Sequence, residues 1–268
     1  MSKPVDLFNS TYGNFEEKVL AEIRRETYGE DIGQTSWITT DEYDTFHSWL
    51  NLSAGDHILE VASGSGGPAL YLAKKFKSHI TGLDINEAGV KTANQQAQDA
   101  KITDAKFQVA DADQSLPFND STFDAAMCID SMNHIRDRLK LLREWHGVLK
   151  AGKRILFTDP VVITGPVSNE ELAARSSIGF FIFIPLEITE NLIKEAGFKL
   201  IRREDVTGNI ELTSGRWHAS RQKHREDLIK IEGEERFDGL QKFFATVHQL
   251  TSERRLSRFV FVAEKQGN

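Results

Sequence analysis

The segment from Glu60 to Pro68, read EVASGSGGP, is the part of the sequence best suited to hold a ligand. Gly64 and Gly66 permit a tight turn and let a ligand approach the backbone. Pro68 suits the first turn of a helix, whose leading N–H groups have no partner within the helix. Together with Ala69 the stretch also fits a loose G-x-G-x-x-A pattern, so a dinucleotide oxidoreductase has to be considered. The loop alone therefore indicates nucleotide binding and leaves the nucleotide open.

Three carboxylates at the ends of predicted strands narrow the choice. Glu60, four residues before the first glycine, would repel a pyrophosphate and could hold an ammonium group. Asp84 could accept hydrogen bonds from both ribose hydroxyls, as in dinucleotide sites. Asp111, beside the small Ala112, could accept from an adenine amino group. The three positions favour a nucleoside that carries an amino-acid group.

The elements that position these residues are read from short apolar runs that alternate with helical patterns. Such alternation indicates βαβ units and a mainly parallel sheet. The predicted strands are Ile58–Ala62, His79–Leu83, Lys106–Val109, Phe123–Ile129 and Arg154–Thr158. The predicted helices between them are Pro68–Phe76, Ala88–Ala100 and Arg138–Val148, and Lys150–Lys153 is expected to be a turn entering the fifth strand.

Less regular segments flank this alternation. Helical spacing of apolar residues begins at Asn14–Arg25, and a second helix is expected from Thr39 or Thr40 to Leu50. After Asp159 the alternation fails. Asn169–Ser177 and the run Phe180–Ile184 then indicate an inserted helical segment. The remaining predicted elements are helix Thr189–Ala196, strand Phe198–Val206, helices Arg216–Lys230 and Arg236–Leu250, and a closing strand Ser257–Ala263.

The sequence resembles the class I S-adenosylmethionine-dependent methyltransferases, and is most similar to the small-molecule branch with sarcosine/dimethylglycine and phosphoethanolamine N-methyltransferases. The resemblance covers roughly residues 30 to 206 and lies in the Glu60–Pro68 loop, Asp84, Asp111-Ala112 and Lys150–Lys153. Ala62 and Ser63 depart from the commoner E-x-G-x-G-x-G loop, which leaves the class unchanged.

The resemblance implies one α/β domain with a Rossmann-like, mostly parallel seven-stranded sheet, helices on both faces and an antiparallel last strand. It divides the chain into an N-terminal helical lid segment (1–50), a cofactor-binding core (51–160), an inserted helical lid segment (161–187) and a C-terminal part (188–268). The implied cofactor is S-adenosylmethionine. The residues expected to bind it are Trp37, Glu60, Ala62, Gly64, Ser65, Gly66, Asp84, Ile85, Asp111, Ala112 and Ile129.

Asp130 and His134 follow the fourth predicted strand, at the edge where open α/β sheets bind ligands. We expect them to be catalytic or to orient the substrate, since histidine titrates near neutrality and can accept a proton. The alternative is that His134 only caps or packs on the next helix. Cys128 lies within the strand and is expected to be structural.

Aromatic residues in both lid segments, among them Phe180 and Phe181, could form a hydrophobic lid or a cation–π site. The basic cluster Arg216–Arg225 has acidic neighbours, so we expect it to be a solvated helix face.

Composition excludes several classes of function. The net charge of −7 disfavours nucleic-acid binding, which usually needs a basic surface. A single cysteine and a polar start, Met1–Ser10, favour a reducing cytoplasm. The longest apolar run, Ile178–Leu186, is too short to span a bilayer. The histidines show no metal-ligand spacing, so no metal is expected.

The expected reaction is methyl transfer to a nitrogen or oxygen of a small molecule. Alternatives are a C- or S-methyltransferase, a non-catalytic S-adenosylmethionine-binding protein and, third, an NAD-dependent oxidoreductase.

Overall fold

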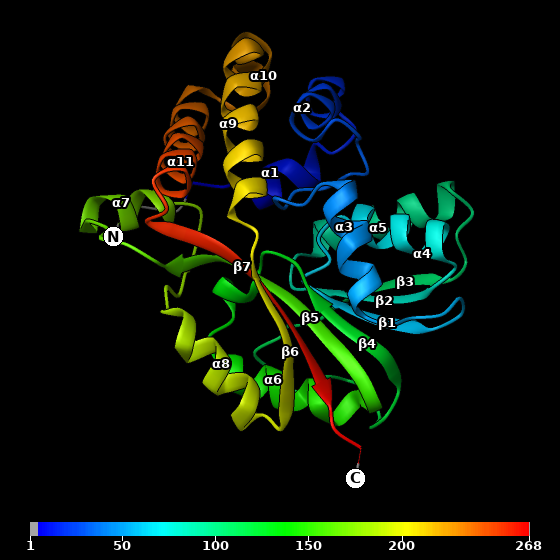
Figure 1. Ribbon diagram of the computed structural model, residues 1–268. Coiled ribbons are helices and arrows are strands. Elements are labelled where there is room, and N and C mark those ends of the chain that lie inside the picture. The colour runs from blue at the N-terminus through cyan, green and yellow to red at the C-terminus, as the bar shows by residue number, and fades with distance from the viewer. Residues whose placement is uncertain (1–4, 268) are drawn as a thin grey trace.

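The computed structural model describes residues 5–267 and is built around one seven-stranded sheet (Figure 1). Residues 1–4, the first part of the polar start Met1–Ser10, lie outside the described residues. Across the sheet the strands follow the order β3-β2-β1-β4-β5-β7-β6. Their bounds are β1 His57–Val61, β2 His79–Asp84, β3 Ala105–Val109, β4 Phe123–Cys128, β5 Leu149–Ile163, β6 Phe198–Asp205 and β7 Leu256–Lys265.

Strand direction agrees with the expected Rossmann-like topology. The pairs β1–β2, β1–β4, β2–β3 and β4–β5 are parallel, whereas β7 runs antiparallel to both β5 and β6. The strand order reverses at β1, because the chain crosses from β3 back to β4 on the other side of β1. Open α/β sheets bind ligands outside the carboxyl ends of the strands at such a point. The fold therefore directs attention to the ends of β1, β2 and β4.

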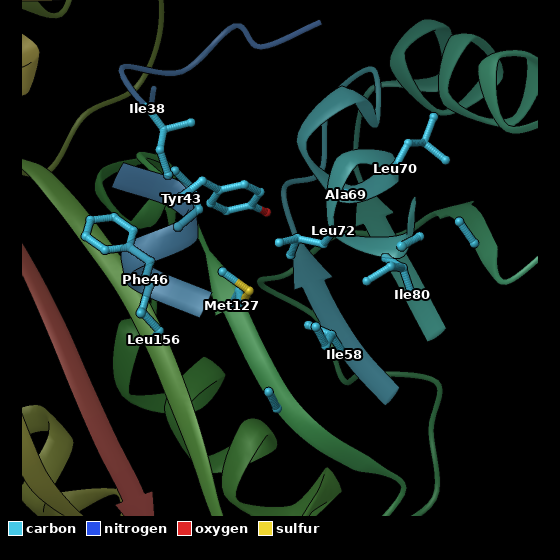
Figure 2. Packing of buried hydrophobic residues seen from close by; sticks show 14 of the residues in the cluster. Ile38, Tyr43, Phe46, Ile58, Ala69, Leu70, Leu72, Ile80, Met127 and Leu156 are labelled. Atoms are coloured by element: carbon cyan, nitrogen blue, oxygen red, sulfur yellow. The ribbon is translucent and has the colours of Figure 1, made fainter. Parts of the chain in front are cut away.

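Helices cover both faces of the sheet, as expected. One face packs against α3 (Thr40–Trp49), α4 (Gly67–Phe76) and α5 (Glu87–Asp99), and the other against α6 (Arg138–Val148) and α8 (Leu186–Glu195). In Figure 2, Tyr43 and Phe46 of α3 lie against the face of the sheet that carries Met127 of β4 and Leu156 of β5. This packing fixes α3 beside the end of β1.

A third group of helices gathers beyond the strands (Figure 1). It contains α1 (Phe8–Gly13), α2 (Lys18–Tyr28), α9 (Thr207–Lys223), α10 (Arg225–Glu232) and α11 (Glu234–Ser252). Their apolar faces form a separate cluster, with Ile23 of α2 and Phe244 of α11 fully buried. The short helix α7 (Asn169–Arg175) contacts α11. The N-terminal helix α2 thus packs with α9, one of the helices that connect β6 to β7.

Three predicted elements are corrected by the structure. The predicted turn Lys150–Lys153 lies within β5, where a register shift against β4 and a positive φ of 73° at Gly152 absorb the irregularity. The run Phe180–Ile184 is extended rather than helical. Its last residue, Ile184, forms a parallel bridge with Val162 of β5, because the run lies along the end of that strand.

The predicted helix Arg216–Lys230 is also different in the structure. It begins earlier, at Thr207, and is divided into α9 and α10 around His224. The start was missed because Thr207–Gly215 holds two glycines and several residues of low helix propensity. Within the basic cluster, Arg221 is buried and paired with Glu232, so it does not belong to a solvated face.

Candidate active site

The glycine loop turns sharply between β1 and α4. Ala62, Gly64 and Gly66 all adopt positive φ angles, of 60°, 56° and 79°. A Cβ atom added to Gly64 would lie 2.6 Å from Oη of Tyr12, on α1. The loop backbone is therefore closely covered by the N-terminal segment, and this contact, more than a backbone angle that Ala62 also adopts, favours glycine at 64.

Glu60 is the penultimate residue of β1 and a buried carboxylate, 5% exposed. Its Oε1 accepts a hydrogen bond of 3.0 Å from Oη of Tyr43, while Oε2 has no partner among the described residues. Burial raises the pKa of Glu60 to about 7. An unpaired buried carboxylate oxygen costs free energy unless a ligand satisfies it. The site thus fits the ammonium group of S-adenosylmethionine, as the sequence predicts.

A pocket that we call the outer pocket lies at the ends of β2 and β3 and is lined by Asp84, Ile85, Asp111 and Ala112. Asp84 accepts hydrogen bonds from backbone N–H groups, at 2.8 Å from Gly64 to Oδ2 and 2.8 Å from Asn86 to Oδ1. Each oxygen keeps a second lone pair for a ribose hydroxyl. Ile85 is 68% exposed and offers an apolar surface for a flat base. The outer pocket fits an adenosine group.

A second pocket, the inner pocket, extends from the end of β1 toward α7, α9 and α11. Glu60, Ser65, Trp37 and Ile129 line it, together with the residues described below. The residues that line both pockets are Phe8, Tyr12, Ala62, Ser131 and His134. The inner pocket therefore adjoins the outer pocket, with Ala62 and His134 among the residues between them.

His134, in the short helix η1 (Met132–His134), lies at this junction. Its Nδ1 is 2.8 Å from the carbonyl oxygen of Phe180 and must be the donor, since a carbonyl only accepts. Nε2 then carries the lone pair. Burial lowers the pKa of His134 to about 4, so its ring is neutral at pH 7. The ring also packs edge-to-face against Phe8 and Phe181.

Asp130 is deeply buried, and both of its oxygens are engaged. The Arg258 guanidinium contacts it through Nε, 2.6 Å from Oδ1, and Nη2, 3.2 Å from Oδ2. Oγ1 of Thr158 donates to Oδ1 at 2.8 Å, and the backbone N–H of Trp37 donates to Oδ2 at 2.9 Å. Because four hydrogen bonds already occupy its two oxygens, these contacts favour a positioning role for Asp130 over the predicted catalytic one.

Trp37 was expected over the methionine end of the cofactor, and the structure places it in the wall of the inner pocket. Its ring packs against three aromatic side chains from the C-terminal helices, with centroid distances of 6.0 Å to Trp217, 6.4 Å to Phe243 and 6.1 Å to Phe244. These three also line the inner pocket. Sequence reasoning missed them, because nothing local in α9 or α11 indicates that they face the end of the sheet.

Asn133 and Arg175 are the polar residues of the inner pocket that sequence reasoning did not select. Asn133 is 1% exposed, and neither its Oδ1 nor its Nδ2 has a partner among the described residues. Arg175, the last residue of α7, is 2% exposed. The position of Asn133, one residue before His134 and just after a strand end, was the available signal. Arg175 had none, because its helix lies outside the alternating pattern.

Comparison with known proteins identifies the domain that carries this site. Residues 59–157 match the family described as Methyltransferase domain. The chain is 28% identical over 235 residues to the 27-O-demethylrifamycin SV methyltransferase of Amycolatopsis mediterranei, covering 83% of this chain and 80% of that protein. It is 26% identical to phosphoethanolamine N-methyltransferase 1 of Zea mays over 96% of this chain, but spans only about half, 51%, of that protein.

The fold is similar to that of phosphoethanolamine N-methyltransferase 2 of Haemonchus contortus, solved with phosphomonomethylethanolamine and S-adenosylhomocysteine. The TM-score is 0.81 at 20% identity, over 97% of this chain and 60% of that one. Among residues 5–267, none of the helices combines the length and apolar character needed to cross a membrane. A cytoplasmic location stays a prediction. With the resemblance in the glycine loop and the acidic strand ends, these matches show that the protein is an S-adenosylmethionine-dependent methyltransferase, with its methyltransferase domain matched over residues 59–157.

Proposed function

We propose that the protein methylates a nitrogen or oxygen atom of a small molecule bound in the inner pocket. The observation that carries this proposal is the junction at Ala62 and His134, where a pocket suited to adenosine adjoins a second pocket with an aromatic wall. Bound S-adenosylmethionine supplies a methyl group on a positively charged sulfur. Gly64, Glu60, Asp84 and Asp111 would hold it, while the aromatic wall of the inner pocket excludes water and aligns the acceptor.

His134 is the residue we assign to the acceptor itself. Its Nδ1–H is committed to Phe180, so Nε2 is the atom that can accept a hydrogen bond. Because the pKa of about 4 keeps the ring neutral, Nε2 orients a hydroxyl or amine proton across the whole range from pH 6 to 9. A proton is removed only when the acceptor arrives protonated.

Asp130 has a different proposed role, as a positioning residue. Its hydrogen bond from the N–H of Trp37 ties the entry of α3 to the end of β4, and its ion pair with Arg258 ties both to β7. The carboxylate therefore fixes the backbone from which Trp37 reaches the inner pocket.

We also propose that the segments Tyr12–Trp37 and Val161–Leu186 form a cover over the acceptor. Tyr12 and Trp37 from the first segment line the inner pocket, as do Arg175 and Phe181 from the second. The C-terminal helices α9 and α11 belong to the same cover, through Trp217, Phe243 and Phe244. The chain then works as one domain in which residues 51–160 hold the cofactor.

The test is release of S-adenosylhomocysteine from S-adenosylmethionine over a panel of small amines, phenols, alcohols and carboxylic acids. Turnover is expected with a nitrogen or oxygen acceptor, and His134→Gln should lower its kcat by about 100-fold with a much smaller effect on cofactor affinity. His146→Gln, on α6 and outside both pockets, is the control. Turnover only with carbon or sulfur acceptors would refute the proposal, as would binding of NAD in preference to S-adenosylhomocysteine by calorimetry.

A further inference from the structure

Arg175 is a buried cation without a carboxylate partner. Among residues 5–267 its guanidinium forms neither an ion pair nor a hydrogen bond, although Arg175 is only 2% exposed and lines the inner pocket. The guanidinium lies instead against two aromatic rings, 4.9 Å from the centroid of Phe181 and 5.3 Å from that of Phe243. Burying an unpaired charge costs several kcal/mol in general, so such a group persists where a ligand compensates it.

The nearest carboxylates do not provide that compensation. Asp130 and Asp159 are the two that act on Arg175 through space, and each is bound directly by another arginine. Arg258 holds Asp130, and Nη1 of Arg138 lies 2.5 Å from Oδ2 of Asp159. Burial is the main influence on Arg175 and lowers its pKa to about 9, so the guanidinium is still charged at pH 7. Because both nearby carboxylates are already paired, this guanidinium is free to bind an anion.

Asn133 adds a second unsatisfied group to the same pocket. Its side-chain amide, like the Arg175 guanidinium, is almost completely buried and has no partner among the described residues. Its backbone oxygen is already used, since it accepts from the N–H of Ile182 at 2.8 Å. A buried amide offers two donors and one acceptor, which suits an oxyanion together with a neighbouring polar atom.

We propose that the methyl acceptor carries an oxyanion, a carboxylate or a phosphate, which Arg175 binds with help from the amide of Asn133. The planar guanidinium donates in a fork that matches both groups. The aromatic rings of Phe181, Phe243 and Trp37 would then enclose an apolar part of the acceptor. This inference rests on the proposed function, because it names the class of acceptor for the same site.

The direct test uses three small probes in calorimetry with the protein saturated with S-adenosylhomocysteine. These are phenylacetate, phenyl phosphate and the neutral phenylacetamide. At least one anion should bind about tenfold or more tightly than the amide, and the better of the two identifies the anion. In Arg175→Met this preference should disappear, and Arg175→Lys should restore part of it. Equal affinity for anions and amide, no binding of any probe at millimolar concentration, or an unchanged preference in Arg175→Met would overturn the proposal.

Thermal stability separates a binding role of Arg175 from a structural one. Removal of an unpaired buried charge should leave the Tm of ligand-free Arg175→Met unchanged or raised. The matched control is Arg221→Met, since Arg221 is equally buried and also packs on aromatic rings but is paired with Glu232. That variant should lose about 5 °C or more and keep the preference for anions. A comparable loss of Tm in Arg175→Met would mark Arg175 as structural.

The two proposals fail in different ways. If the wild-type protein does not bind S-adenosylhomocysteine, the proposed function fails. If it binds S-adenosylhomocysteine and methylates only uncharged acceptors, the methyltransferase reaction stands and the oxyanion site is refuted.

Discussion

The Arg258 guanidinium and the Asp130 carboxylate form a two-contact ion pair, of 2.6 Å and 3.2 Å, that joins β7 to the end of β4 inside the protein. Arg258 is completely buried and also contacts both carboxylate oxygens of Glu42 on α3, each at 2.7 Å. One arginine near the C-terminus therefore holds two segments that border the inner pocket. Loss of Arg258 would leave the Asp130 and Glu42 carboxylates unpaired, and loss of both carboxylates would leave the Arg258 guanidinium unpaired.

Arg258→Met is accordingly expected to lower the free energy of unfolding by about 3–5 kcal/mol, because Asp130 and Glu42 would stay buried without their partner. Urea denaturation followed by circular dichroism measures this. The control is Arg143→Met, whose exposed pair with Glu195 should contribute nothing measurable. Equal stability of the two variants would show that the buried pair is not structural.

Asp84→Ala should weaken S-adenosylhomocysteine by at least about tenfold, through loss of ribose hydrogen bonds and of the acceptor that fixes the Gly64 N–H. Calorimetry on the folded variant provides the measurement. Asp104→Ala removes an exposed carboxylate just before β3 and should bind like the wild type. Unchanged affinity in Asp84→Ala would contradict the assignment of the outer pocket.

Gly64→Ala should abolish cofactor binding while the protein stays folded. Ala62 already adopts a similar φ, so the effect comes from the added Cβ, which would lie 2.6 Å from Oη of Tyr12 and displace a side chain that lines both pockets. The comparison is Gly208→Ala in α9, where the added atom meets nothing within 4 Å. Fluorescence or calorimetric titration with S-adenosylhomocysteine distinguishes them, and full binding by Gly64→Ala would mean that the loop does not touch the ligand.

The affinity for S-adenosylhomocysteine should depend on pH through Glu60. In the free protein burial raises the pKa of Glu60 to about 7, and an ammonium group pairs only with the ionised form. Below pH 7 the proton has to be removed for binding, so the affinity at pH 6 should be about tenfold lower than at pH 8. Glu60→Gln should bind more weakly and lose this pH dependence. A flat profile in the wild type would contradict the role of Glu60.

The same raised pKa has a consequence for stability in the absence of ligand. The pKa of Glu60 is higher in the folded chain than its usual 4.5, so its stabilising contribution is complete below pH 4.5 and is lost as pH rises through 7. Between pH 6 and 8 the ligand-free Glu60→Gln variant should therefore lose less stability than the wild type. Urea denaturation at both pH values measures the free energy of unfolding. If that free energy changes equally with pH in the two proteins, Glu60 has an ordinary pKa.

The sequence by itself was enough to predict the class of protein, its cofactor and the residues proposed to bind that cofactor. The loop from Glu60 to Pro68 and the acidic residues Asp84 and Asp111 lie next to strands whose order along the chain fixes their place at one edge of the sheet. The position of these residues depends on local sequence. The periodicity of apolar residues and the residue types of the turns were therefore enough to predict it. The prediction that the last strand is antiparallel came from the family resemblance. The antiparallel pairing of β7 with β5 and β6 confirms it.

Only the tertiary structure showed what surrounds the residues of the proposed acceptor pocket. Asp130 and His134 are close in the sequence, yet their surroundings come from residues at a distance: Arg258 is 128 positions from Asp130, and Phe180 is 46 positions from His134. Whether a carboxylate is a base or half of an ion pair depends on such partners, since desolvation and charge set its pKa. The same holds for Arg175, whose lack of a partner becomes visible only when every neighbour in space is known.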